Sequence, residues 1–218
     1  MLLDNKTAIV YGAAGAIGSA VAQAYAREGA EVHLVGRTAP TMEEVAQRIQ
    51  RDGGNPHVMQ LDVLDRPALE RHAATVAAAS GGIDVCFNAT SNDDRQGTPL
   101  LDMQFEDFLR PVTKAAHVAW TALAGLCRQL AAEFGPHGVR VSWLLSPGSP
   151  GYKASDQQPQ HPSDDDSEPG PAPGTQGLLL HHQPTYDEVA NTATFAASDW
   201  ARTIIASEIN ITGGAVID

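Results

Sequence analysis

Two kinds of segment alternate along the chain: short runs of apolar and β-branched residues, and longer stretches in which apolar residues recur at helical spacing. The short runs are residues 7–11, 31–35, 58–61, 83–88, 139–145 and 208–212. The helical spacing covers residues 19–28, 41–52, 67–79, 105–134 and 186–198. Strands that alternate with helices favour a parallel sheet with helices on both faces. The pattern therefore predicts an α/β fold with a doubly wound parallel sheet.

Residues 147–177 depart from this pattern. They hold half of the fourteen prolines, the run Asp164-Asp165-Asp166, and no Val, Ile, Leu, Phe or Met. A segment of this composition has too little apolar surface to order itself by burial. We expect a flexible acidic Pro-rich loop here, within one domain that spans residues 1–218, because a chain of this length builds a single core.

The composition argues against several classes of partner. A net charge of −12 and a pI near 4.9 disfavour nucleic acid and anionic membranes, because both attract clustered Lys and Arg. Cys86 and Cys127 form neither a disulfide framework nor a zinc-binding spacing. No run is long and apolar enough for a signal peptide or a membrane span. We expect a cytoplasmic protein with no membrane partner and no bound metal.

A glycine-rich motif, Tyr11-Gly12-Ala13-Ala14-Gly15-Ala16-Ile17-Gly18, follows the first predicted strand and opens the first predicted helix. In this context Gly12 permits a tight turn, Gly15 lets the backbone approach a pyrophosphate, and Gly18 lets the helix pack closely on the sheet. The free N–H groups of the helix start, which includes Ala16 and Ile17, face such an anion. The motif predicts a Rossmann-like dinucleotide site, and a glycine-rich turn that binds nothing is the alternative.

The end of the second predicted strand reads Leu34-Val35-Gly36-Arg37-Thr38. In dinucleotide-binding folds, an acid at this place bonds the ribose 2′-hydroxyl, whereas a cation accepts a 2′-phosphate. No acid occurs from Val32 to Met42, and the planar, permanently charged guanidinium of Arg37 suits a phosphate. The sequence therefore favours NADP over NAD. A solvated surface arginine is the other interpretation.

The order of several further motifs resembles that of the short-chain dehydrogenase/reductase family. They are Asp62-Val63 after the third strand, Asn88-Ala89-Thr90 after the fourth, Pro147-Gly148 after the fifth, and the closing residues 209–214. The resemblance implies a nicotinamide dinucleotide as partner. It also implies that Asp62 and Val63 border the adenine, Asn88 and Ala89 line the cofactor cleft, and Pro147 and Gly148 lie near the nicotinamide. Each of these motifs equally suits an ordinary turn or cap.

Members of this family transfer hydride between the cofactor and a carbonyl or alcohol, with a Tyr-x-x-x-Lys pair for proton transfer and a Ser that holds the substrate oxygen. The lysine lowers the tyrosine pKa, since a phenol is otherwise too weak an acid at neutral pH. None of the four tyrosines of this chain has a lysine four residues later. Aligned with the family's catalytic helix, residues 105–134 place Ala116 and Trp120 at the Tyr and Lys positions. We therefore assign no catalytic residue.

The family's Ser-bearing strand also has no counterpart, because helical spacing runs without a break from Glu106 to Glu133. The chain is expected to be one βα unit short, a loss of about 30 or more residues. Such a loss is tolerable, since each unit adds one strand and one helix in the same right-handed sense. The region of Pro111 and Lys114 then marks the junction, where a helix bend is expected.

Other residues carry weaker signals. Tyr152-Lys153 lies in the Pro-rich segment, where a solvated surface is the more common role. His181-His182 lacks an acidic or Cys partner at metal-ligand spacing. His117, on one predicted helix with Lys114, is either a general base or an ordinary surface or packing residue.

Three functional hypotheses stay open. The first is an NADP-dependent oxidoreductase with an atypical mechanism, which the family resemblance favours. The second is a non-catalytic cofactor-binding or interaction protein, which the absence of the Ser, Tyr and Lys favours. The third is a non-functional remnant with a compromised sheet. The resemblance further implies a homo-oligomer formed through residues 105–134, although the apolar stripe around Trp120 equally suits a core-facing surface.

Overall fold

The computed structural model describes residues 1–90, 131–146, 178–180, 182 and 184–214. The strands are β1 Thr7–Tyr11, β2 Glu31–Gly36, β3 Asn55–Gln60, β4 Val85–Asn88, β5 Trp143–Leu145 and β6 Glu208–Asn210. The helices are α1 Ala16–Arg27, α2 Ala39–Arg51, α3 Arg66–Ser80 and α6 Tyr186–Ala197, with 3-10 turns η2 Gly135–His137 and η4 Asp199–Ala201. None of the described helices combines the length and the apolar character that crossing a bilayer requires.

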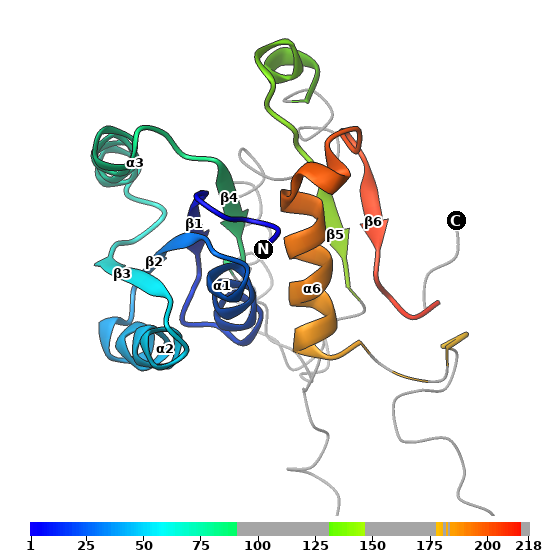
Figure 1. Ribbon diagram of the computed structural model, residues 1–218, viewed down its shortest axis with the longest axis horizontal. Helices are drawn as coiled ribbons and strands as arrows, with labels where there is room; N and C mark the ends of the chain where they lie inside the picture. The colour runs from blue at the N-terminus through cyan, green and yellow to red at the C-terminus, as the bar shows by residue number, and fades with distance from the viewer. Residues whose placement is uncertain (91–130, 147–177, 181, 183, 215–218) are drawn as a thin grey trace, which may run out of the picture.

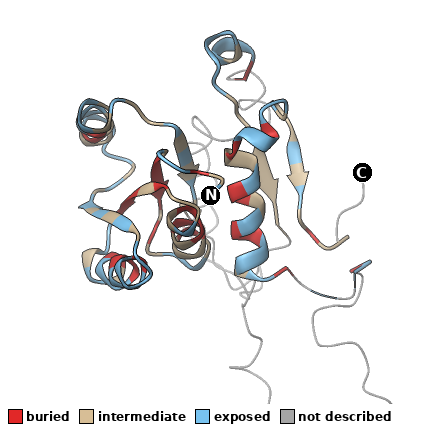
Figure 2. Cartoon of the chain, viewed as in Figure 1, coloured by how far each residue is buried: buried red, intermediate tan, exposed pale blue. Residues whose placement is uncertain are grey.

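The first four strands form one parallel sheet in the order β3-β2-β1-β4. Because β1 and β2 lie inside this sheet, nearly every one of their residues is buried, as a strand covered on both faces requires (Figures 1 and 2). The reversal of strand order between β1 and β4 creates a crevice at the carboxyl ends of the strands. The observed architecture confirms the predicted α/β doubly wound fold.

Helices α1, α2 and α6 cover one face of the sheet, and α3 covers the other. Residues of β1 and β2 alternate between the two cores: Val10 and Leu34 pack with α1 and α2, whereas Ile9 and Val35 pack with Val76 of α3. This alternation follows from the twofold period of a strand. The two faces therefore provide separate chemical environments on either side of the same strands.

Helix α6 joins the β5–β6 pair to the larger sheet. It begins with a capping box in which the Thr185 hydroxyl accepts from the Glu188 N–H at 3.2 Å and the Glu188 carboxylate accepts from the Thr185 N–H at 2.7 Å. Its buried Ala190 and Ala193 belong to the same core as Tyr25 of α1, whose hydroxyl lies 3.5 Å from the Ala193 carbonyl oxygen. Figure 1 shows α6 between α1 and the β5–β6 pair.

Arg140 fixes the end of α6. Its guanidinium donates hydrogen bonds to the carbonyl oxygens of four residues, Ala196, Ala197, Ser198 and Ala201, at 2.7 to 3.2 Å. The last carbonyls of a helix have no intrahelical partner, and a cation at this end also suits the helix dipole. Arg140 thereby ties the segment before β5 to the end of α6.

Several element bounds differ from those expected. Helix α1 begins three residues earlier than predicted, at Ala16, and β3 begins at Asn55 rather than at Val58. Pro56 is accommodated in β3 because this strand lies at the edge of the sheet, where one side needs no ladder hydrogen bonds. Strand β5 is limited to Trp143–Leu145, and the described part of the long predicted helix is residues 131–134.

The mostly apolar run at residues 83–88 predicts a fourth strand that is buried on both faces, and this expectation is wrong. Its residues alternate between half-buried and exposed, with Cys86 and Asn88 exposed. The reason is its position, because β4 is the outer strand of the four-stranded sheet in the described part of the chain. The remaining described strands, β5 and β6, pair with each other in a second parallel sheet.

Candidate functional site

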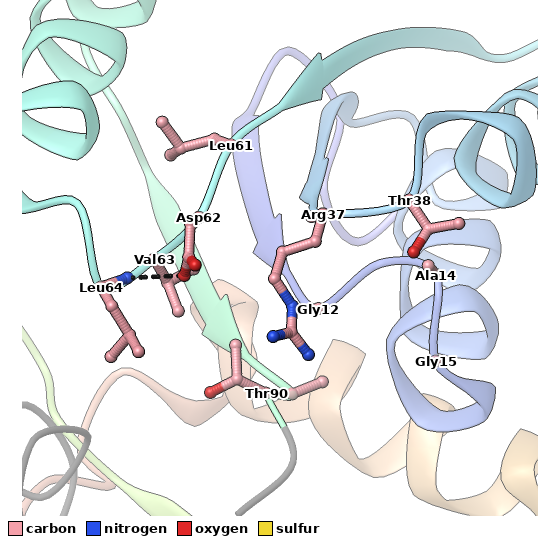
Figure 3. Close-up of a pocket in the computed structure, with 12 residues that line it drawn as sticks. Gly12, Ala14, Gly15, Arg37, Thr38, Leu61, Asp62, Val63, Leu64 and Thr90 are labelled. Carbon is pink, nitrogen blue, oxygen red and sulfur yellow. Dashed lines mark hydrogen bonds between the residues drawn. The ribbon is translucent and has the colours of Figure 1, made fainter. Parts of the chain in front are cut away.

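The carboxyl ends of β1, β2, β3 and β4 surround a cavity of about 200 Å³ (Figure 3). Its walls are formed by the residues that directly follow these strands. They are Gly12, Ala14, Gly15, Gly36, Arg37, Thr38, Leu61, Asp62, Val63, Leu64, Ala89 and Thr90. We call this cavity the strand-end cleft. It lies where open α/β sheets bind their ligands, at the switch in strand order.

The turn after β1 is shaped by close approaches of its backbone. Gly12 has a φ of +76°, and a Cβ atom there would lie 2.6 Å from the Ala89 carbonyl oxygen of the turn after β4. A Cβ atom on Gly18 would lie 2.3 Å from the Gly12 carbonyl oxygen. The N–H groups of Gly12 and Ala13 both donate to the Val35 carbonyl oxygen, at 2.9 and 3.2 Å. These contacts hold the start of α1 against the ends of the neighbouring strands.

The first turn of α1 presents unpaired backbone donors. The Gly15 N–H donates to Gly12, and the helical ladder begins with Ser19 donating to Gly15 at 2.8 Å. The N–H groups of Ala16, Ile17 and Gly18 precede this ladder, and no described residue accepts a hydrogen bond from them. No acidic side chain occupies this turn, and Gly15 and Ala16 are exposed. Such a helix start can accept an anionic group.

Arg37 brings the positive charge of the strand-end cleft. It directly follows β2, and its exposed side chain points toward the part of the cleft bordered by Gly12 and Thr90 (Figure 3). The backbone at this position is fixed, because the Gln60 side chain donates to the Arg37 carbonyl oxygen at 3.0 Å. Within the described ranges no carboxylate pairs with its guanidinium, which leaves the donors of Arg37 available to a ligand.

The residues after β3 and β4 close the other sides of the cleft. The Asp62 carboxylate accepts from the Leu64 N–H at 3.0 Å, which fixes the turn after β3. The Asn88 side-chain oxygen accepts from the N–H and the hydroxyl of Thr90, at 3.1 and 2.8 Å. Asn88, the last residue of β4, thus orients Thr90 in the turn that follows and does not line the cavity itself.

The fold brings together most residues that the sequence singled out. Six line the strand-end cleft: Gly12, Gly15, Arg37, Asp62, Val63 and Ala89. Four more adjoin it, at the start of α1 and at the end of β4: Ala16, Ile17, Gly18 and Asn88. Pro147 and Gly148 lie outside the described residues. The other six lining residues were not predicted from the sequence, although each directly neighbours a predicted one: Ala14, Gly36, Thr38, Leu61, Leu64 and Thr90.

Two of the described tyrosines, Tyr11 and Tyr25, do not provide a proton donor for this cleft. Tyr11, at the end of β1, is buried, and burial raises its pKa to about 12. Burial likewise raises the pKa of Tyr25, which lies under α6. Lys6, which could lower a tyrosine pKa, instead pairs with Asp84 at 3.2 Å near the amino ends of β1 and β4. Both tyrosine shifts run opposite to the one that acid–base catalysis at neutral pH requires.

A parallel sheet with a glycine-rich turn, an open helix start and a cleft at its switch point defines a dinucleotide-binding α/β protein. Residues 6–119 match the family model described as short chain dehydrogenase, and residues 109–216 match the one described as enoyl-(acyl carrier protein) reductase. The protein belongs to the short-chain dehydrogenase/reductase family. This family consists of oxidoreductases that use nicotinamide dinucleotides, and the predicted membership is confirmed.

Individual relatives agree with this assignment. The chain is 30% identical to the D-threitol dehydrogenase of Mycolicibacterium smegmatis, over 99% of this chain and 94% of that protein. It is also 38% identical to the uncharacterized oxidoreductase YxbG of Bacillus subtilis over 95 residues. That alignment covers 44% of this chain and 35% of YxbG. Among solved structures, the carveol dehydrogenase of Mycobacterium avium in complex with NAD has a TM-score of 0.78 at 19% identity, with 98% of each chain covered. This last likeness concerns the fold alone.

The comparison with D-threitol dehydrogenase also bears on the length of the chain. The alignment runs over 259 positions, which exceeds the 218 residues of this chain by 41. At least that many positions of the alignment are gaps in this chain, a shortfall of the size of one βα unit. The two family-model matches meet at residues 109–119, which include the predicted junction at Pro111 and Lys114. Both observations support the expectation of a shortened family member.

Proposed function

We propose that this protein binds NADP(H) in the strand-end cleft, with the Arg37 guanidinium on the 2′-phosphate. One observation carries the proposal: the side chain that follows β2 is a cation with which no described carboxylate pairs, and no acid occurs from Val32 to Met42 to receive a 2′-hydroxyl. An arginine can bind a phosphate with two parallel hydrogen bonds, whereas an NAD site uses an Asp or Glu here.

The rest of the described cleft fits a dinucleotide. Gly12 and Gly18 keep the turn close to α1 without side chains in the way, and the N–H groups of Ala16, Ile17 and Gly18 supply donors for the pyrophosphate. Asp62 and Val63, after β3, are proposed to border the adenine, and Ala89 to line the cleft beside the glycine turn. By family resemblance, we propose that Pro147 and Gly148 lie near the nicotinamide.

When bound, the nicotinamide ring supplies or accepts the hydride of the family's chemistry. The residues of this chain provide binding and orientation, but none of the described ones provides the family's acid–base pair: the chain has no Tyr-x-x-x-Lys, and burial raises the pKa of Tyr11 and Tyr25. We therefore propose a cofactor-binding protein without turnover of carbonyl or alcohol substrates. The second candidate is an oxidoreductase with another proton donor, which family membership favours.

Titration of the full-length protein with NADPH and NADH, followed by nucleotide fluorescence, tests the cofactor assignment. Wild-type protein is expected to bind NADPH roughly 10- to 100-fold more tightly than NADH, as one charge-assisted contact to phosphate provides. Arg37→Asp is expected to abolish or reverse this preference, because a carboxylate repels the 2′-phosphate and accepts from a 2′-hydroxyl. Arg71→Asp makes the same charge change on an exposed residue of α3 outside the cleft and should leave the preference intact.

Retention of the NADPH preference in Arg37→Asp, or a wild-type preference for NADH, would contradict the assignment. The same samples, supplied with NADPH and a panel of aldehydes and ketones, separate the two candidate functions. Binding without substrate-dependent NADPH oxidation supports the proposed function, whereas oxidation that disappears in Arg37→Asp identifies an oxidoreductase.

A further inference from the structure

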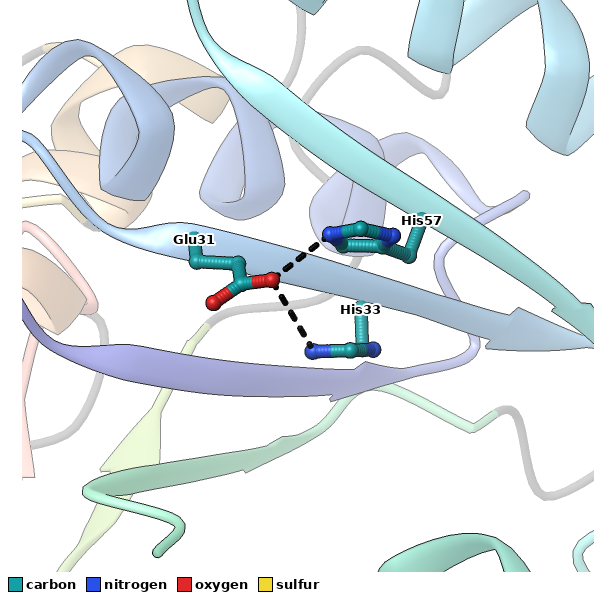
Figure 4. Close-up of side chains that lie close together, drawn as sticks. All are labelled: Glu31, His33 and His57. Atoms are coloured by element: carbon teal, nitrogen blue, oxygen red, sulfur yellow. Dashed lines mark ion pairs between the residues drawn. The ribbon is translucent and has the colours of Figure 1, made fainter. Parts of the chain in front are cut away.

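A second group of polar side chains lies on the α3-covered face of the sheet, away from the strand-end cleft. Glu31 and His33 are two residues apart on β2, so their side chains project from the same face. His57 on β3 is the direct register partner of His33, which places the two imidazoles side by side. We call Glu31, His33 and His57 the β2–β3 triad (Figure 4).

The ligand atoms of this triad converge. The Glu31 Oε1 atom lies 2.7 Å from His57 Nε2 and 4.0 Å from His33 Nε2, and one atom from each residue lies within 4.8 Å of the others. The two imidazoles stack at 4.7 Å between ring centroids, and Figure 4 shows a nitrogen of each ring pointing toward the carboxylate. The other oxygen, Oε2, accepts from the Ser80 hydroxyl at 3.4 Å, which orients the carboxylate.

His33 gives the independent reason to look for a ligand. The residue is 9% exposed, and its Nε2 atom is buried with no hydrogen-bond partner, since Glu31 at 4.0 Å is too distant for one. A buried polar atom without a partner carries a desolvation penalty and requires an explanation. The unpartnered atom faces the same carboxylate that His57 contacts, which is where a cation would be attracted.

We propose that the β2–β3 triad binds a divalent transition-metal ion, with Zn²⁺ as the ion it fits best. Two neutral imidazoles and one carboxylate are a common ligand set for zinc, and the fourth position of a tetrahedron is left to water. Zinc–nitrogen bonds of about 2.0–2.1 Å imply ligand atoms about 3.3 Å apart. Two side-chain rotations are needed to reach this spacing: His57 turns away from its ion pair and toward His33, and the Glu31 carboxylate moves closer to His33 than its present 4.0 Å. The ion then takes the place of the direct contact between Glu31 and His57.

The exposure of the three side chains suits binding from solvent. The side chain of His33 is 11% exposed, that of Glu31 33% and that of His57 46%, so the triad is closed at its His33 side and open to solvent at its His57 side. His72 of α3 lies edge-on to His33 at 6.2 Å between ring centroids and covers the closed side. An ion can therefore enter without rearrangement of the sheet.

A metal at this place would tie the edge strand to the sheet. β3 is the outermost strand beside β2, and its residues are mostly exposed. The triad lies near the amino end of β2, and His33 precedes Arg37 by four residues, or about 13 Å along an extended chain. The proposed ion is thus separate from the strand-end cleft and acts on the stability of the β2–β3 pair.

Equilibrium dialysis of untagged, chelator-treated full-length protein against Zn²⁺, with elemental analysis of the bound metal, tests the site. Wild-type protein should bind one equivalent of Zn²⁺, and the variants His57→Gln and Glu31→Gln should lack this bound ion. Loss of an outer-sphere partner alone weakens metal sites about 10- to 100-fold, so loss of a direct ligand should weaken binding by about 100-fold or more. At about 100 times Kd, Zn²⁺ should raise the Tm of the wild type by about 5–10 °C and leave that of His57→Gln unchanged.

His182→Gln is the matched control. His182 forms a pair with Glu188 at 3.2 Å, and its side chain is 47% exposed, close to the 46% of His57. The described part of the chain brings no third ligand to this pair. The zinc affinity of His182→Gln should therefore equal that of the wild type. The proposal is overturned if the wild type binds no stoichiometric Zn²⁺, if His57→Gln retains wild-type affinity, or if His182→Gln loses as much affinity as His57→Gln. The Tm values of all variants without metal establish that each is folded.

Discussion

Gly12 illustrates how single positions determine the strand-end cleft. Its φ of +76° is a conformation that L side chains rarely adopt, and a Cβ atom would also meet the Ala89 carbonyl at 2.6 Å. Neither cost can be relieved by a side-chain rotation, since both involve backbone. The turn after β1 and the turn after β4 can approach each other only with a glycine at this position.

Gly12→Ala is therefore expected to lower the free energy of unfolding by about 2–4 kcal/mol and to weaken NADPH binding. Gly53→Ala separates the two causes, because Gly53 has a similar φ of +85° with open space around its added Cβ. That variant should lose only about 1–2 kcal/mol, the conformational part alone. Chemical denaturation of both variants measures the difference. Equal losses would show that the close contact between the two turns is unimportant.

The residues of the strand-end cleft were predictable to the extent that their role is local. The glycine spacing and Arg37 could be assigned because a turn, a helix start and a strand end follow one another within the sequence. Thr38 and Leu64 line the cleft only because four separate strand ends meet there. The β2–β3 triad gave no signal, since 24 residues separate His33 from His57 and only the parallel register joins them.

At the scale of elements, the types of secondary structure were predicted better than their bounds. Helix α1 begins at Ala16 because the N–H of Ser19 already bonds to Gly15, whereas the apolar spacing becomes regular only further along. β3 extends through Pro56 because it is an edge strand. β5 is shorter than its apolar run, since its pairing is limited to the three residues of β6. Strand pairing, which sequence patterns do not contain, set these limits.

Arg140 permits a test of how the elements after residue 130 are held together. Arg140→Lys keeps a charge near the end of α6 but loses the fork that reaches four carbonyl oxygens. We expect it to lower the free energy of unfolding by about 1–2 kcal/mol, and Arg140→Ala by about 2–3 kcal/mol, because partly buried carbonyls lose charge-assisted hydrogen bonds. Thermal unfolding with Arg71→Ala as an exposed control measures both. A loss below about 0.5 kcal/mol for Arg140→Ala would show that the four bonds do not stabilise the fold.

At the scale of the whole molecule, this chain is short for its family but keeps the four strands that surround the strand-end cleft. β1 to β4 form one continuous sheet with the order of a dinucleotide-binding fold, while the described β5 and β6 form a separate pair linked through α6. The alignment with D-threitol dehydrogenase leaves at least 41 positions without a residue in this chain. The half of the fold to which we assign the adenosine end of the cofactor thus lies within the described residues.

Because that half can be probed without nicotinamide, the most direct test of the proposed function uses the adenosine end alone. Isothermal titration calorimetry of the full-length protein with 2′-phospho-ADP and with ADP compares ligands that differ only in the phosphate assigned to Arg37. We predict that 2′-phospho-ADP binds at least about tenfold more tightly than ADP, and that Arg37→Gln removes this difference while leaving ADP binding nearly unchanged. Equal affinities in the wild type, or a difference that survives in Arg37→Gln, would contradict it.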